Sequence, residues 1–398
     1  MENIKRVRLS EISTLITKGT TPTTLGFEFQ NKGINFLKIE CFDEIGNYIP
    51  DKIAHISDEC NEKLKRSKLE SGDILFSIAG AIGRVAIVTE EMLPANTNQA
   101  LAIIRIKDNS VYLPYVKLIL NSPIVKKQFE KKKQGVAQLN LSLKDINELE
   151  IPLPDKDKQV EFAKIFEKLF AIISNRQAQL SKLDQLVKAR FVEMFGDPVT
   201  NPKGLPISLL GELSELITKG ASPSWQGFSY TDDDTQTLFV TSENVREGYI
   251  DLSSPKYIED GFNEKQKRSV LKKGDFLINI VGASIGRVAQ FNLERKANIN
   301  QAAALVRINS AIVRDKYLLT YLNSDKAQQM YNSMKSDTGR ANLSLQDISN
   351  LSILLPPIEQ QIEFEHFIEQ VEKVKSKVKE SLDKAQTLFD SLMQEYFG

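Results

Sequence analysis

Hydrophobic and polar residues follow two patterns along this 398-residue chain, and each pattern predicts a different kind of structure. Short apolar stretches punctuated by Gly and Pro are typical of strands. They cover Asp73–Ala79, Arg84–Val88, Ala100–Ile106, Phe276–Val281 and Ala303–Ile308. Two further segments, Leu113–Lys133 and Asp315–Met334, have helical spacing. Strands dominate the middle of each region, so we predict α+β globules rather than alternating βαβ units.

Two long segments without Gly or Pro predict long helices that begin just after prolines. In the first, Gln159–Glu193, a continuous helix would reach about 50–60 Å. Apolar residues in both segments repeat with an imperfect heptad spacing, which favours helix–helix pairing over packing of each stripe on its own globule. The residues expected to pair are Leu169, Ile173, Leu180, Leu183, Val187, Met194, Val371, Val378, Leu382, Ala385, Phe389, Leu392 and Tyr396.

The chain is a tandem duplication, and this decides its domain organisation. Strings in the first half recur 201–203 residues later. The clearest matches are Leu15–Gly19 with Leu216–Gly220, Gly83–Ala86 with Gly286–Ala289, Asn98–Ala100 with Asn300–Ala302, and Asn140–Ile146 with Asn342–Ile348. We predict a globule at 1–154, a helix at 155–196, a second globule at 197–357 that begins with a linker at 197–209, and a second helix at 358–398.

Composition narrows the class of protein. The chain has 41% hydrophobic and 26% charged residues, with 52 basic and 52 acidic side chains. It lacks an apolar run of about 18 residues and a signal-peptide pattern, so a cytoplasmic protein is expected. Two cysteines and two histidines make a disulfide scaffold or a zinc site improbable, and we expect no metal site. Zero net charge argues at first against nucleic-acid binding.

Catalytic motifs are not found in the sequence. Phosphate-loop, dinucleotide-loop and amino-methyltransferase signatures are missing. Neither His55 nor His366 suits a general base, and Cys41 and Cys60 are better explained as buried apolar residues than as nucleophiles. We therefore expect no catalytic residue and no cofactor bound by this chain.

Polar and basic turns recur at the same places in both copies, and this favours recognition over ordinary solvated loops. Lys and backbone N–H groups suit phosphate, whereas Gln, Asn and Arg suit base edges. The candidate DNA-binding residues in the first copy are Thr17, Lys18, Gly19, Thr20, Thr21, Lys63, Lys65, Arg66, Lys68, Arg84, Gln138 and Asn140. Those in the second are Thr218, Lys219, Gly220, Ser222, Lys265, Lys267, Arg268, Lys272, Lys273, Arg287, Arg340 and Asn342.

The order of these strings, present twice, resembles the specificity subunit of Type I restriction–modification systems over essentially the whole chain. The resemblance implies two target recognition domains, each reading half of a bipartite DNA sequence, and two antiparallel helices acting as a spacer. It also implies two methyltransferase subunits as partners, which use S-adenosylmethionine to methylate adenine N6. Translocase–nuclease subunits that use ATP and Mg²⁺ would join through the complex.

The two copies differ where reading is expected, which predicts two unlike half-sites. Asn31–Phe36 has no match in Thr231–Gln236, and Trp225 replaces Thr24. Two other interpretations stay open: a helical adaptor that binds only proteins, and the recognition portion of a stand-alone methyltransferase or nuclease. By segment, the net charge is +2, +2, 0 and −4, so a zero total does not exclude DNA binding through local basic loops.

Overall fold

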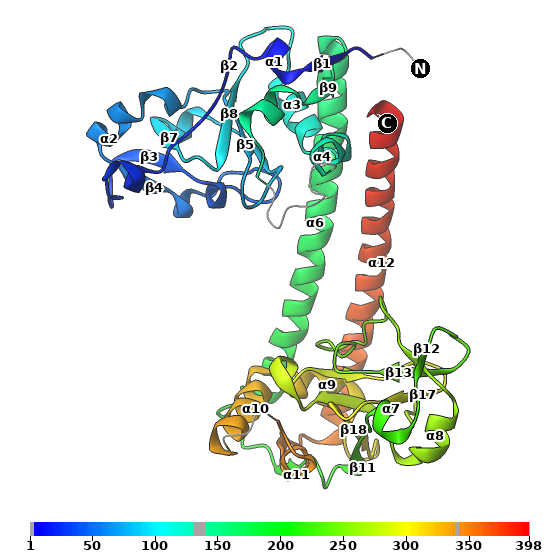
Figure 1. Ribbon diagram of the computed structural model, residues 1–398. Helices are drawn as coiled ribbons and strands as arrows, with labels where there is room; N and C mark the ends of the chain where they lie inside the picture. Colours follow the sequence, from blue (N-terminus) through cyan, green and yellow to red (C-terminus); the bar gives the residue numbers. More distant parts are fainter. Residues whose placement is uncertain (1–3, 131–139, 339–341, 398) are drawn as a thin grey trace. The chain divides into compact units, whose positions relative to one another are not determined.

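The computed structural model describes residues 4–130, 140–338 and 342–397, and the chain forms two compact units (Figure 1). The first unit comprises Met1–Gln177 with Ser381–Gly398, and the second comprises Ala178–Glu380. Each unit is a mixed α+β globule together with parts of two long helices. The predicted fold class is thereby confirmed.

The first globule contains three sheets. Their strand orders are β2-β8-β5-β6, β4-β3-β7 and β1-β9, and in the second of these sheets β3 pairs with β7 in parallel. The strands are β1 (Arg6–Arg8), β2 (Leu15–Lys18), β3 (Ile34–Leu37), β4 (Ala54–Ile56), β5 (Ile74–Ser77), β6 (Val85–Ile87), β7 (Ala95–Thr97), β8 (Leu101–Arg105) and β9 (Glu150–Pro152). The helices are α1 (Leu9–Ile12), α2 (Asp58–Lys63), α3 (Leu113–Leu120), α4 (Pro123–Glu130) and α5 (Leu143–Asn147).

The second globule repeats the plan with sheet orders β11-β18-β15-β16, β12-β14-β13-β17 and β10-β19. Its strands are β10 (Ile207–Leu209), β11 (Ser214–Lys219), β12 (Tyr230–Thr231), β13 (Thr237–Val240), β14 (Tyr257–Ile258), β15 (Phe276–Asn279), β16 (Val288–Gln290), β17 (Ala297–Ile299), β18 (Ala303–Ile308) and β19 (Ser352–Leu354). Its helices are α7 (Pro223–Gln226), α8 (Gly261–Lys265), α9 (Asp315–Leu322), α10 (Asp325–Thr338) and α11 (Leu345–Ser349).

The two segments predicted to be helical, 113–133 and 315–334, are helical over most of their described residues, but each is divided into two helices. In the first, α3 ends before Pro123, whose ring and missing N–H prevent a helix from continuing through it. In the second, Ser324 separates α9 from α10, and its hydroxyl accepts a hydrogen bond from the Ala327 N–H. Serine in that position favours a new helix start over continuation.

The long helices are α6 (Lys156–Phe195) and α12 (Ile358–Phe397), each of forty residues. A buried glutamine fixes each helix start to its globule. Gln159 accepts a hydrogen bond from the Tyr112 N–H at 2.8 Å and donates to the Ser110 and Pro154 carbonyls. Gln361 does the same with the Arg314 N–H and the Ile312 and Pro356 carbonyls. Each amide thus satisfies buried backbone groups at a helix entrance.

The helices run antiparallel where they meet within each unit. In the first unit, Phe162 stacks on Tyr396 with ring centroids 4.5 Å apart, and Arg176 Nε donates to Ser381 Oγ at 3.2 Å. As the contacting residue number rises along α6, the number of its partner on α12 falls, which shows that the two helices run in opposite directions. In the second unit, Lys375 Nζ lies 2.8 Å from Asp184 Oδ1, and Phe191 packs on Phe364.

The residues expected to pair the helices lie on the covered side of α6 and α12. In the first unit, Leu169, Ile173 and Ala385 are buried, and the half-buried members are Leu382, Phe389, Leu392 and Tyr396. In the second unit, Val371 is buried, and the half-buried members are Leu180, Leu183, Val187, Met194 and Val378.

Each globular core also contains the end of the other copy's helix. Phe397, at the end of α12, packs against Tyr115 of the first globule with ring centroids 6.1 Å apart. Phe195, at the end of α6, packs against the equivalent Tyr317 of the second globule at 4.9 Å. All four side chains are buried. Neither copy therefore completes its core with its own helix alone.

We expect Phe397→Ala to destabilise the first unit by about 3–4 kcal/mol and Phe195→Ala to destabilise the second by a similar amount, because each change leaves a cavity in one core. Hydrogen exchange measured on peptides from both globules would separate the two effects. Ser391→Ala, an exposed change on the same helix as Phe397, is the control. Equal loss of protection in both globules after either Phe change would contradict the reciprocal arrangement.

Candidate nucleic-acid interface

Four polar turns lie along one edge of the main sheet in the first globule. The strand pairing sets Lys18 opposite Ala102 and Ser77 opposite Leu101, so the end of β2, the start of β8 and the end of β5 share this edge. The Thr-Lys-Gly turn follows β2, the Asn-Gln-Ala turn precedes β8, and the turn that contains Arg84 joins β5 to β6. The Leu141 N–H then donates to the Ile78 carbonyl, which brings the start of the Asn-Leu-Ser-Leu element to the same edge.

The second globule gathers the same turns in the same way. Lys219 pairs with Ala304 and Asn279 with Ala303, and the Leu343 N–H donates to the Ile280 carbonyl. Asn342 forms a β-bridge with Val281 beside this edge. Motifs that are more than 120 residues apart in each copy therefore form one surface. We call it the turn edge of each globule.

The glycine of the Thr-Lys-Gly turn is required by a close backbone approach. A Cβ at Gly19 would lie 1.8 Å from the Thr97 carbonyl oxygen, and one at Gly220 would lie 1.8 Å from the Ile299 carbonyl oxygen. No side chain fits in that space. The turn is thus held against the end of β7 or β17, directly before the Asn-Gln-Ala turn.

Side chains on the turn edge are presented unevenly. Lys18 and Lys219 are exposed, Thr20, Thr21, Thr218 and Ser222 are half-buried, and Thr17 is buried. Thr21 donates its hydroxyl proton to Gln99 Oε1, which ties two of the turns together. Asn140 and Asn342 are exposed, whereas Gln138 and Arg340 lie outside the described residues. The two lysines and two asparagines are the most accessible of the predicted residues here.

The arginines of the β5–β6 and β15–β16 turns are half-buried rather than free on the surface. Arg84 donates to the Phe42 carbonyl at 3.0 Å and to the Ile39 carbonyl at 3.5 Å. Its guanidinium therefore braces the neighbouring loop within the first globule. Arg287 occupies the equivalent position and is also half-buried.

The basic turns η4 (Lys65–Ser67) and η7 (Lys267–Ser269) pack against β2 and β11. Their Lys65, Arg66, Lys267 and Arg268 are exposed, as are the nearby Lys63 and Lys265. Ser67 donates to Asn96 Oδ1 at 2.7 Å, which attaches η4 to β7. The side chains of η4 and η7 thus flank the strands that end in the Thr-Lys-Gly turns.

Lys68, Lys272 and Lys273 lie toward the opposite edge of each main sheet. The Lys68 carbonyl accepts a hydrogen bond from Arg105, which pairs with Leu15 at the far end of β2. Lys68 also forms an ion pair with Glu62, and Lys273 forms one with Glu294 at 2.6 Å. The structure therefore separates these three lysines from the turn edge.

A Gly-Asp motif recurs in both copies as Gly72-Asp73 and Gly274-Asp275. A buried ion pair explains its aspartate, and the arginine partner was not predicted from the sequence. Arg105 Nε donates to Asp73 Oδ1 and Arg105 Nη2 donates to Asp73 Oδ2, each at 2.7 Å. Arg307 binds the two oxygens of Asp275 in the same way and at the same distances. The hydrogen bonds that each guanidinium donates to its carboxylate raise the pKa of both arginines above the ordinary value. The signal was available, because Arg105 and Arg307 are 202 residues apart inside matching strands.

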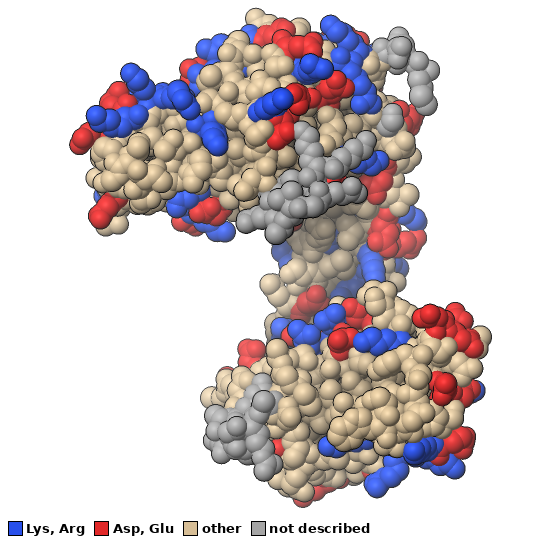
Figure 2. Space-filling model, in the orientation of Figure 1, with Lys and Arg blue, Asp and Glu red and all other residues tan. Residues whose placement is uncertain are grey.

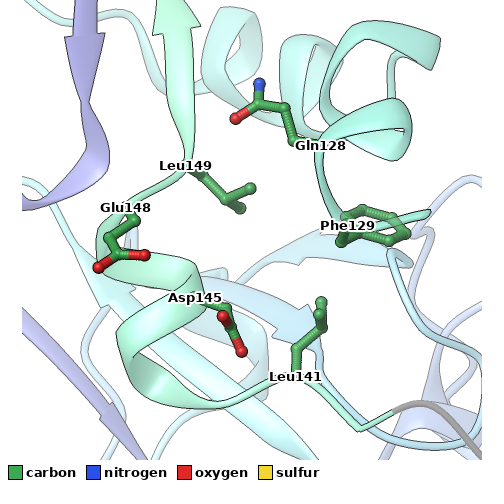
Figure 3. A pocket seen from close by; sticks show the side chains of 6 residues that line it. All are labelled: Gln128, Phe129, Leu141, Asp145, Glu148 and Leu149. Atoms are coloured by element: carbon green, nitrogen blue, oxygen red, sulfur yellow. The ribbon is translucent and has the colours of Figure 1, made fainter. Parts of the chain in front are cut away.

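A small pocket of about 180 Å³ lies between α4 and α5 (Figure 3). Leu141, Phe129 and Leu149 supply apolar walls, and Asp145 and Glu148 add carboxylates. Asp145 Oδ2 already accepts hydrogen bonds from the Ser142 N–H and hydroxyl, which form the N-terminal cap of α5. This carboxylate is thus engaged in local folding.

The remaining chemistry-bearing side chains are occupied or shielded. Burial raises the pKa of the Cys41 and Cys60 thiols, which lowers their nucleophilicity. Within residues 4–130, 140–338 and 342–397, no three His, Cys, Asp or Glu side chains are grouped so that they could hold a metal ion. In that same part of the chain, no helix is long and apolar enough to cross a membrane. Charges of both signs are interspersed on the face of each globule that Figure 2 shows.

The fold and its repeated turn edge define a class of protein: a duplicated α+β recognition module braced by long helices. The family model for the Type I restriction modification DNA specificity domain matches residues 1–185 and 206–384. The chain belongs to this family, and the resemblance expected from the sequence is confirmed.

Individual relatives agree with the family assignment. The Type I restriction enzyme EcoBI specificity subunit of Escherichia coli is 32% identical over 167 residues, which cover 40% of this chain and 34% of that protein. The MjaVIII specificity subunit of Methanocaldococcus jannaschii is 21% identical over 276 residues, covering 65% of this chain and 64% of that protein. This chain thus aligns with only about one third to two thirds of the length of these two relatives.

Solved structures share the fold. One solved structure is described as giving the structural basis of complex assembly and conformational transition of the type I R-M system. It has a TM-score of 0.60 at 19% identity, covering 98% of this chain and 96% of that one. The Type-I restriction-modification system S subunit from M. genitalium has a TM-score of 0.58 at 13% identity, covering 100% and 97%. These likenesses support the fold.

We expect Asp73→Asn to destabilise the first unit by about 2–3 kcal/mol, because it removes the buried charge partner of Arg105 and leaves that largely buried guanidinium only the exposed Glu70. Glu70→Gln is the matched control, since Glu70 contacts the same arginine at 2.5 Å but is exposed, and its loss should cost less than about 1 kcal/mol. Urea unfolding measures both changes. Similar effects for the two variants would contradict the assigned role of the Gly-Asp motif.

Proposed function

We propose that this chain selects the DNA target of a Type I restriction–modification complex. Each globule reads one half of a bipartite sequence through its turn edge and the adjacent basic turn. The observation that carries the proposal is the repeated gathering of the same turns, with exposed Lys18 and Lys219 and exposed Asn140 and Asn342. Lysines suit phosphates, and asparagines suit the adenine edge.

The DNA target is asymmetric, because the two globules differ beside the shared turns. Trp225 is 89% exposed on α7, where the first globule has Thr24. Tyr249 is exposed as well, and its counterpart is Asn47. Exposed aromatic rings contact bases and sugars with an apolar face that Thr and Asn lack. The second globule therefore reads its half-site by different contacts.

The chain is a non-catalytic subunit, and its partners supply the chemistry. It scaffolds two methyltransferase subunits that carry S-adenosylmethionine and methylate adenine N6. Translocase–nuclease subunits that use ATP and Mg²⁺ join through this complex and cleave unmodified DNA. The membership in the specificity family supports this division of labour. A helical adaptor that binds only proteins is the main alternative, and DNA binding by this chain distinguishes the two.

We expect charge reversal at Lys65 and Arg66, or at Lys267 and Arg268, to weaken DNA binding by about tenfold or more for all sequences. Each lost phosphate contact should reduce the slope of log affinity against log salt by about 1. Fluorescence anisotropy with the assembled complex measures both. Lys273→Glu is the comparison, because Lys273 lies toward the opposite sheet edge. An equal loss there would contradict binding through the turn edge, and no loss in any variant would favour the adaptor.

We expect Trp225→Ala to alter the bases accepted in one half-site only. The chain would be co-expressed with the genes that neighbour its own, and adenine methylation would be mapped across the genome. Thr24→Ala in the first globule is the matched control. Replacing residues 1–154 with those of a relative should change the other half-site alone. A change in both half-sites after either experiment would contradict one globule per half-site.

A further inference from the structure

Trp225 is a large apolar ring that the folded chain leaves in water. It is the one tryptophan of the sequence, and its 89% exposure is the largest for any exposed large apolar side chain within residues 4–130, 140–338 and 342–397. Burying an aromatic side chain removes about 150–250 Å² of surface from water, and folding of the second globule leaves that stabilisation unused. Single exposed apolar residues are ordinary, so the case for a ligand depends on how this ring is held and on what surrounds it.

The short helix that carries Trp225 is held rigidly. α7 begins at buried Pro223 and ends at Gly227, whose φ of 83° lets its N–H donate back to the Pro223 and Ser224 carbonyls. The Phe228 N–H also donates to the Pro223 carbonyl, at 3.1 Å. The ring therefore projects from a closed turn, and little conformational entropy is lost when it meets a ligand.

Two contacts attach α7 to α8, the helix that leads into the basic turn η7 (Figure 1). Lys265, the last residue of α8, donates from Nζ to the Gln226 carbonyl at 2.9 Å. Phe228 packs edge-to-face on the buried Phe262, with ring centroids 5.6 Å apart. Packing inside the second globule thus fixes the position of Trp225 relative to the basic turn.

Basic side chains accompany the ring. Exposed Lys219 ends β11 four residues before α7, and exposed Lys267 and Arg268 follow α8 in η7. Lys267 is 3.6 Å from Glu264, and an ion pair between exposed side chains is weak enough for a phosphate to replace. An apolar ring among cations matches single bases or base steps flanked by phosphates. A purely apolar protein partner would leave these cations without a role.

The first globule has no aromatic ring at the matching position. Thr24 stands where Trp225 does, and its hydroxyl donates to the Thr21 carbonyl at 2.6 Å within its own turn. Leu25, the next residue, is 50% exposed but has no flat π face, and its counterpart is Gln226. The contact that Trp225 makes is therefore particular to the second globule.

We infer that Trp225 inserts its ring into a base step of the second half-site, unstacks that step and bends the DNA there. The inference rests on the proposed function and deepens it, because it names the means by which the second globule selects its half-site. Apolar side chains that proteins insert between base steps kink DNA by about 20–90°. Pyrimidine–purine steps, TA and CA/TG, deform most easily. The second half-site therefore contains such a step and is selected partly by its deformability.

The test uses the assembled complex and a duplex that carries the target obtained by mapping adenine methylation. The second half-site is the one that replacement of residues 1–154 leaves unchanged. 2-Aminopurine is placed at each of its purines except the methylated adenine, because a methyltransferase extrudes that base. Dyes at the two ends of the duplex report bending by energy transfer.

Wild type should raise 2-aminopurine fluorescence at one pyrimidine–purine step and bend the duplex. Trp225→Ala should abolish both signals and weaken binding about 10- to 100-fold, which is the usual effect of removing a ring that stacks on a base. Trp225→Phe keeps a ring and should retain both signals at reduced strength. Leu25→Ala is the matched control and should leave the signals from the second half-site unchanged.

Thermal unfolding of Trp225→Ala should match wild type within a few degrees, because the side chain is exposed. Tight binding of wild type without unstacking that depends on Trp225, or unstacking at a step other than TA or CA/TG, would overturn the inference and leave the proposed function intact. Loss of a protein subunit from the Trp225→Ala complex, measured by native mass spectrometry, would show that the ring contacts protein and would also overturn it. Failure of the wild-type complex to bind the duplex would count against the proposed function itself.

Discussion

The packing of Phe397 on Tyr115, and of Phe195 on Tyr317, is the constraint on which the architecture depends. Each tyrosine also donates its hydroxyl proton to a carbonyl of the strand that leads into its own long helix, Pro152 for Tyr115 and Leu354 for Tyr317. One buried ring thus joins the start of one helix to the end of the other. The duplication is consequently structural, because one copy alone would leave its core open and its terminal phenylalanine exposed.

Polar residues also lie in the interface between α6 and α12, where they add to the packing of Phe397 and Phe195 in the two cores. Arg176, Lys375 and Arg190 occupy positions that an all-apolar seam would fill with Leu or Ile, and each has a partner on the other helix: Ser381, Asp184 and Glu363. Polar seam residues cost stability but select one register and one direction of pairing. The register is important here, because a slip by one heptad would withdraw Phe397 and Phe195 from their cores.

Much of the fold could be predicted from the sequence, because a repeat can be aligned with itself. Strings shared by the copies located the sheet strands, and the absence of Gly and Pro located α6 and α12. The broken helices were missed at Pro123 and Ser324, since an apolar period continues across a short interruption that only capping or ring geometry reveals. The packing of each helix end in the other copy's core could not be predicted. Heptad spacing indicates that a helix has a partner, but it does not identify the core in which the last turn of the helix is buried.

The sequence predicted which types of residue form the candidate site but did not show where these residues lie relative to one another. Sequence reasoning grouped Lys68 with Lys65 and Arg66 because they are adjacent, yet the strand register carries Lys68 toward the opposite edge. It selected Arg84 for its charge, whereas the guanidinium is used to hold the Phe42 carbonyl. Strings identical in both copies therefore mix two kinds of residue: those that build the framework, such as Gly19 and Asp73, and those that the turn edge presents.

Under the proposed function, this division explains how one framework would serve two different half-sites. Gly19 and Gly220 fix the turn against a neighbouring backbone, and the Asp–Arg pairs close the opposite end of each main sheet. Both devices operate through backbone contacts and buried charge, so they are independent of the DNA sequence. The residues that differ, such as Trp225 against Thr24, project from the rigid turns and can change without disturbing the core. A duplicated chain with an unchanged framework and altered turns is thus suited to an asymmetric target.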